Sequence, residues 1–210
     1  MSRFILSIMA LLGAITVPAQ MTPRSVLTTA PEKVLLTIDA STLLDMLDYY
    51  ENGVARTVKN KAGEDAVITE MTESTITLNT GAAHSISFAI LPYGKSSVIM
   101  AVDRVDSPST DAVVTFYDSR WKPLDSRKLL RFPTLADWTG KLSPDKMEEI
   151  ENALPFLMVD ARYNPATSTL TFTPQIGDYV SVENAGKVKD ALAPQLDYVW
   201  SGKSFKPVKR

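Results

Sequence analysis

Three carboxylates lie close together in the stretch 43–52, which reads LLDMLDYYEN: Asp45, Asp48 and Glu51. Acid–base chemistry is one possible use for them, because two carboxyl groups that flank a glycosidic bond can hydrolyse it. The same residues could instead form the solvent side of an amphipathic helix. The spacing of the apolar residues between them distinguishes the two interpretations.

These apolar residues repeat with the period of a helix. One side of the wheel carries the packing stripe, which is Leu43, Met46, Leu47 and Tyr50. The opposite side carries Asp45, Asp48 and Asn52. Asp39 or Ser41 can cap such a helix and Gly53 can end it. We therefore predict an amphipathic helix whose acids face solvent, with a contact to a partner as the alternative role for that polar face.

His84 is the only histidine of the chain. A serine hydrolase would need it beside a nucleophile and an orienting carboxylate. Ser85 and Ser87 are near in sequence, but His84 and Ser85 point to opposite faces of a strand, and no G-x-S-x-G elbow is present. We expect a half-exposed strand histidine and no catalytic residues.

Metal and cofactor signals are equally sparse. With one histidine and no cysteine, only an oxygen-rich Ca²⁺ or Mg²⁺ site is conceivable. The calcium-loop pattern is missing, and Asp103 and Asp106 would face opposite sides of a strand. Neither a G-x-G-x-x-G nor a Walker A motif occurs. The sequence predicts no metal site and no cofactor.

Aromatic side chains are the remaining candidates for binding, since they can stack on sugars or form a protein-binding patch. The candidates are Tyr117, Trp121, Trp138, Tyr198 and Trp200. At strand ends such residues usually pack in the core. If one patch is exposed, we expect it at Tyr117 and Trp121, beside a turn at 118–122. The basic residues of 127–131 are interpreted as a solvated face.

The first residues have the order of a secretory signal peptide. Arg3 precedes an apolar run from Phe4 to Val17, and Ala19 follows as a small residue before a plausible cleavage point. We predict a signal peptide over 1–19 and export to the periplasm or the extracellular space. The absence of cysteine argues against a lipid anchor and leaves stability to packing without disulfides.

The formal net charge of −2, or −3 once Arg3 is removed, does not favour nucleic acid as a partner. No later apolar run is long enough for a membrane span. The remaining partners to consider are another envelope protein or a glycan.

After the helix, apolar and polar residues alternate in short segments separated by turn residues, which predicts strands. We place these at 54–59, 66–71, 75–79, 84–91, 97–105 and 111–117. Further on, we expect helices over 143–154 and 182–192, a hairpin over 156–173 and a closing hairpin over 198–205. Residues 20–30 are polar and read as a leader.

Strands that follow one another without intervening helices indicate an antiparallel sheet. The predicted class is α+β, a largely antiparallel meander with about three helices packed on it. We expect a single domain over 20–210, with a weak sub-boundary near 125–142.

Several short pieces of the chain resemble an exported Bacteroidales family grouped as domain-of-unknown-function family 3256. They are Leu44–Tyr49 with Gly53, Val58–Asn60 before a glycine turn, Phe116–Asp118 with Trp121, and Trp200-x-Gly202-x-x-Phe205. The resemblance implies a location in or outside the Gram-negative envelope, but it implies no activity and no catalytic residues.

Two functions remain open. The first is an exported, non-catalytic binding or accessory protein of the bacterial cell envelope. The alternative is a carboxylate-based hydrolase of envelope or dietary polysaccharide, which would need a cleft with two suitably spaced acids.

Overall fold

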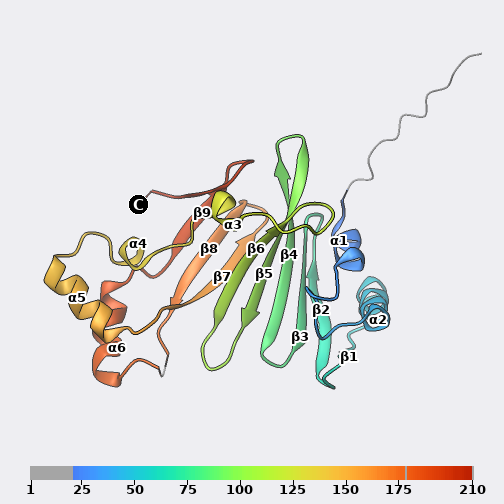
Figure 1. Cartoon of the computed structure of the whole chain (residues 1–210). Helices are drawn as coiled ribbons and strands as arrows, with labels where there is room; N and C mark the ends of the chain where they lie inside the picture. The colour runs from blue at the N-terminus through green and yellow to red at the C-terminus, as the bar shows by residue number, and fades with distance from the viewer. Residues whose placement is uncertain (1–20, 178, 210) are drawn as a thin grey trace, which may run out of the picture.

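The computed structural model describes residues 21–177 and 179–209, and within them it has an α+β fold (Figure 1). A six-stranded antiparallel sheet runs in the order β1-β2-β3-β4-β5-β6. Its strands are β1 (Val58–Lys59), β2 (Asp65–Met71), β3 (Thr75–Gly81), β4 (His84–Tyr93), β5 (Ser96–Val105) and β6 (Asp111–Tyr117). The predicted meander is therefore confirmed.

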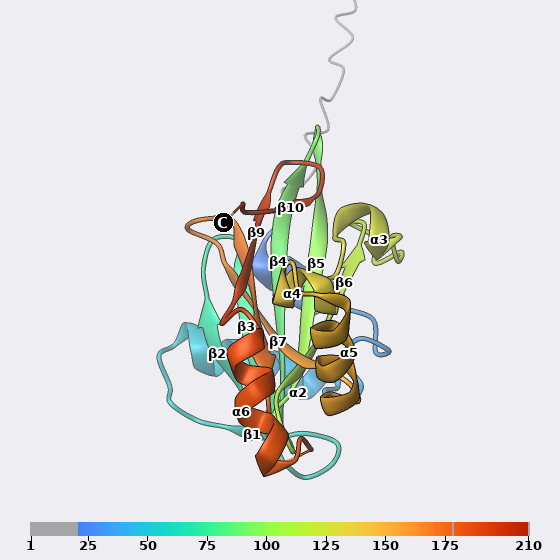
Figure 2. The same cartoon turned by 90° about the vertical axis from the view of Figure 1, so that its left-hand side faces the viewer.

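A second, four-stranded antiparallel sheet has the order β10-β9-β8-β7. Its strands are β7 (Met158–Asn164), β8 (Thr169–Gln175), β9 (Leu196–Trp200) and β10 (Phe205–Pro207). The helices are α1 (Pro23–Thr29), α2 (Ala40–Glu51), α3 (Ser126–Leu129), α4 (Leu135–Thr139), α5 (Pro144–Ala153) and α6 (Val182–Ala191). Figures 1 and 2 show α1 and α2 beside the first sheet and α5 with α6 at the far end of the second.

The larger sheet is buried on both faces where β4 and β5 run. Ile99 and Ala101 of β5 belong to a core shared with α1 and α2. Val98, Met100 and Val102 belong to a second core, shared with the four-stranded sheet. Successive side chains of a strand point to opposite faces, so this run of apolar residues serves both cores. The four-stranded sheet thus packs on the face opposite the helices.

Helix α1 corrects the expectation of a polar leader over 20–30. Thr22 caps it through a reciprocal pair of hydrogen bonds with Ser25, and Pro23 occupies its first turn. Val26 and Leu27 are buried in the core under the helix. The burial of Pro23, Val26 and Leu27, together with the cap, therefore stabilises this segment as a helix despite its polar and threonine-rich composition.

Helix α2 confirms the prediction for the stretch 43–52. Asp39 Oδ1 accepts a hydrogen bond of 2.8 Å from the Thr42 N–H at the start of the helix. Leu43, Met46 and Leu47 are buried, whereas Asp45 and Asp48 are exposed. The carboxylates of this stretch are the solvent side of a packed helix.

Within the described residues, three further predictions can be compared with the structure. Six helices occur instead of about three, because α1, α3 and α4 are short elements that the apolar period does not reveal. Of the strand predicted over 54–59, only Val58 and Lys59 pair. No helix in the described part of the chain is long and apolar enough to cross a membrane. The predicted signal peptide, 1–19, lies outside the described residues.

Candidate functional site

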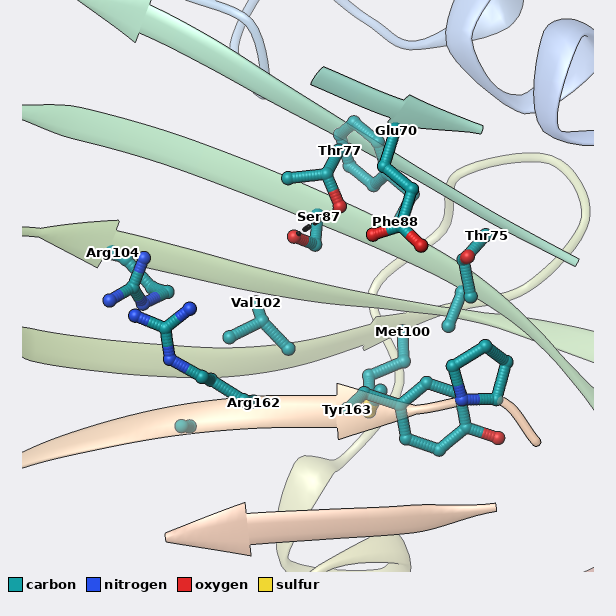
Figure 3. A pocket seen from close by; sticks show the side chains of 13 residues that line it. Glu70, Thr75, Thr77, Ser87, Phe88, Met100, Val102, Arg104, Arg162 and Tyr163 are labelled. Atoms are coloured by element: carbon teal, nitrogen blue, oxygen red, sulfur yellow. Dashed lines mark hydrogen bonds between the residues drawn. The ribbon is translucent and has the colours of Figure 1, made fainter. Parts of the chain in front are cut away.

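The four-stranded sheet covers only part of the face on which it packs, and a groove remains beside it. The groove has a volume of about 200 Å³ and lies between strands β2–β5 and the β7 end of the second sheet (Figure 3). We define it by six of its lining residues: Glu70, Thr77, Ser87, Val102, Arg104 and Arg162.

The wall on β3 and β4 is made of small hydroxyl side chains. Thr77 and Ser87 are opposite each other in the β3–β4 register, and their hydroxyl oxygens are 3.0 Å apart. Their strand neighbours Ile76, Ile86 and Phe88 are buried in the core under α1 and α2. The period of two thus directs the apolar residues toward the helices and the hydroxyls into the groove.

The cationic end of the groove is built on an ion pair that joins the two sheets. Arg104 Nε donates to Asp160 Oδ1 at 2.6 Å, and its Nη2 donates to Oδ2 at 3.2 Å. Arg104 Nη1 also donates to the Ser85 hydroxyl at 3.2 Å, and Nη2 to Asp106 at 3.3 Å. The Arg104 guanidinium is therefore fixed from several sides.

The Asp160 side chain is only 11% exposed. Burial raises the pKa of the Asp160 carboxyl, but hydrogen bonds and charge from Arg104, joined by those of Arg162, outweigh burial and hold the pKa below its usual range. Asp160 is consequently an ionised anchor for both guanidinium groups.

Arg162 and Glu70 are less constrained. Arg162 Nε donates to Asp160 Oδ2 at 2.9 Å, while 69% of its side chain stays exposed. Figure 3 shows the Arg162 and Arg104 guanidinium groups next to each other, and the Glu70 carboxylate farther along the groove. The buried side chains of Val102 and Met100 form the base of the groove, and the half-buried Tyr163 adds apolar surface. The site combines opposite charges, hydroxyls and an apolar floor.

The family model for Protein of unknown function (DUF3256) matches residues 15–205. The chain belongs to this family. The match confirms the resemblance inferred from the short sequence motifs. None of the curated proteins compared with the chain matches it.

A solved structure of a domain of an uncharacterized protein from Porphyromonas gingivalis W83 is similar to this DUF3256 chain. The TM-score is 0.76 and the sequence identity is 20%, over 89% of this chain and 98% of the other. A likeness at this identity shows a shared fold and carries no function.

The prediction that Tyr117 and Trp121 form an exposed patch is wrong, because neither side chain is exposed. Trp121 is buried, its ring meets Phe88 edge to face at 5.4 Å, and its Nε1 donates to the Thr29 hydroxyl at 3.1 Å. Tyr117 is half-buried and packs against Trp121. The predicted tight turn exists, but Trp121 has a φ of 61°, and its indole packs into the core under α1. Trp138, Tyr198 and Trp200 are core residues.

The single histidine has partners that the sequence did not reveal. His84 Nε2 lies 2.7 Å from Asp103 Oδ1, and its Nδ1 is hydrogen-bonded to the Thr80 hydroxyl. A hydroxyl, an imidazole and a carboxylate are thus in line, on the opposite face of the sheet from the groove. Thr80 is only 3% exposed, however, and a nucleophile so enclosed has little access to a substrate. We interpret the set as structural.

His84 is on β4 and Asp103 on the neighbouring strand β5, where it lies opposite Ile86. The sequence could have suggested this contact only if the β4–β5 register had been known. The prediction of a half-exposed histidine is confirmed, with 40% of its side chain accessible. No cluster of possible metal ligands occurs within the described residues.

Proposed function

We propose that this protein is an exported, non-catalytic binding protein of the bacterial cell envelope, and that it holds a polar ligand in the groove. The observation that carries the proposal is the chemistry of the groove: two charged side chains with spare hydrogen-bonding capacity, paired hydroxyls and an apolar floor. Ligand sites commonly combine a concave apolar surface with a few polar groups that fix orientation.

The arrangement of carboxylates supports binding over hydrolysis. A glycosidase of the usual kind needs two carboxyl groups, one to protonate the leaving group and one to attack or to activate water. Asp160 is ionised, only 11% exposed and paired with both Arg104 and Arg162, so it has no proton to donate and is not free to attack a substrate. Glu70 is then the carboxylate that faces the groove.

Hydrogen exchange tests the proposal. The full chain is mixed with an envelope fraction from the bacterium that produces it, and amide exchange is followed by mass spectrometry. We expect slower exchange at the groove rim, residues 70–75 and 162–168, and no change in α5, which lies at the far end of the molecule (Figure 1). Unchanged rim exchange, or slowing confined to α5 and α6, would contradict the proposal.

A further inference from the structure

We propose that the ligand of the groove is a short zwitterionic peptide, with its carboxylate on Arg162 and its ammonium group on Glu70. This inference rests on the proposed binding function and names the chemical class of its ligand.

Arg104 and Arg162 share Asp160 but differ in what remains for a ligand. Arg104 uses all three of its guanidinium nitrogens on Asp160, Ser85 and Asp106, and its side chain is 12% exposed. Arg162 uses only Nε, and within the described residues its two terminal nitrogens have no hydrogen-bond partner. Asp160 therefore holds Arg162 in place and leaves the fork of its guanidinium open.

An open guanidinium fork recognises a particular group. Its parallel N–H bonds match the two oxygens of a carboxylate, and such bidentate pairs add geometric specificity to charge attraction. Arg104 lies next to it in Figure 3 but is itself paired with Asp160 and Asp106, so recognition rests on the open fork of Arg162. This end of the groove is suited to a carboxylate.

Glu70 gives the groove the opposite charge at a distance from the arginines. It is exposed, lines the groove and forms neither a hydrogen bond nor an ion pair with any described residue. It does not reach Arg162, so both charges remain available at once. A polyanion would be repelled by Glu70 and a polycation by the arginines, whereas a molecule with one charge of each sign fits both.

The surface between the charges suits a peptide backbone. The hydroxyls of Thr77 and Ser87 are hydrogen-bonded to each other, so the pair keeps one O–H donor and free acceptor lone pairs for an amide group. Tyr163 and Pro165, which are half-buried, offer apolar contact for a small side chain. Pockets for drug-sized ligands have volumes of about 300–1,000 Å³, so a cavity of about 200 Å³ fits a smaller ligand such as a dipeptide. A neutral sugar would leave both charges unmatched.

Calorimetric titration with three dipeptides tests the inference on the full chain. Ala-Ala carries both charges, N-acetyl-Ala-Ala lacks the ammonium group and Ala-Ala amide lacks the carboxylate. We expect Ala-Ala to bind at millimolar concentrations or below, and each blocked form to bind at least about tenfold more weakly.

Two variants then assign each charge to its residue. Arg162→Gln should weaken Ala-Ala binding by about tenfold and leave the weak binding of Ala-Ala amide unchanged. Glu70→Gln should weaken Ala-Ala and leave N-acetyl-Ala-Ala unchanged. Arg120→Gln and Glu73→Gln, both exposed and outside the groove, are the matched controls and should bind Ala-Ala as the parent does. Thermal melting of each variant checks that it is folded.

The inference is overturned if Ala-Ala fails to bind, or if the blocked dipeptides bind as well as Ala-Ala. If Ala-Ala fails while the envelope fraction still slows exchange at the groove rim, the peptide class is wrong and the binding function stands. If both measurements fail, the proposed function is wrong as well.

Discussion

Arg104 of β5 and Asp160 of β7 form a two-point ion pair across the two sheets, with oxygen–nitrogen distances of 2.6 and 3.2 Å. Only 12% and 11% of these side chains are exposed, so the pair is largely withdrawn from water. It fixes the second sheet against the first and positions the guanidinium groups of the groove. Its role in stability can be separated from its role in binding.

Replacing Asp160 should destabilise the fold. Asp160→Asn leaves Arg104 without its main counter-charge, and removal of one partner from a buried pair costs about 3–5 kcal/mol. Urea denaturation should show this loss as a lower free energy of unfolding. Asp106→Asn is the matched control, because Asp106 is a more exposed partner of the same guanidinium and its loss should cost under about 1 kcal/mol. Equal effects of the two substitutions would contradict the central role of Asp160.

The His84–Asp103 contact should make stability depend on pH near neutrality. The hydrogen bond with Asp103 is the largest cause that raises the pKa of His84 in the folded chain, and it outweighs the effect of burial. A raised pKa means that the stabilisation is fully present below the unfolded pKa of about 6.5 and is lost as the pH rises through the folded value.

Unfolding free energies measured from about pH 5 to about pH 8 test this expectation. Because His84 is the only histidine, its titration is the main side-chain event in that range. The parent protein should lose stability as the pH rises, and Asp103→Asn should flatten this dependence. A variant that keeps the slope of the parent would show that the contact with Asp103 is not its source.

Trp121 should matter for stability because its indole is part of the core. Trp121→Ala removes the contact with Phe88 and the hydrogen bond to Thr29, and truncation of a buried aromatic costs about 3–5 kcal/mol. Tyr117→Phe keeps the ring and should change the free energy of unfolding by less than about 1 kcal/mol. Chemical denaturation of both variants measures the difference. A Trp121→Ala variant as stable as the parent would contradict the packing of Trp121 in the core.

Local patterns in the sequence account for much of this fold. The period of two placed most of the strands of the larger sheet, and the period of a helix identified α2 with its buried stripe and exposed acids. Helix α1 was not predicted, because only Pro23, Val26 and Leu27 are buried in an otherwise polar, threonine-rich segment. Trp121 was misplaced for a similar reason: a left-handed backbone conformation, which sequence does not specify for tryptophan, accompanies its burial.

The groove could not be predicted in this way. Glu70 and Arg162 come from different sheets, and they share a site only because the second sheet packs on part of the first. Nothing in the local pattern of either strand reports that arrangement. The hydroxyls of Thr77 and Ser87 gave a partial signal, since polar residues on alternate positions of central strands indicate a face that the core leaves uncovered.

Thiol labelling tests the claim that the groove is the binding site most directly, because the chain contains no cysteine. Ser87→Cys places one thiol in the groove, and Ser119→Cys places one on an exposed turn as a control. The rate of alkylation by iodoacetamide is measured for each variant with and without the envelope fraction. We predict that the fraction slows labelling several-fold at position 87 and leaves position 119 unchanged. Equal labelling rates at position 87 with and without the fraction would contradict a ligand site in the groove.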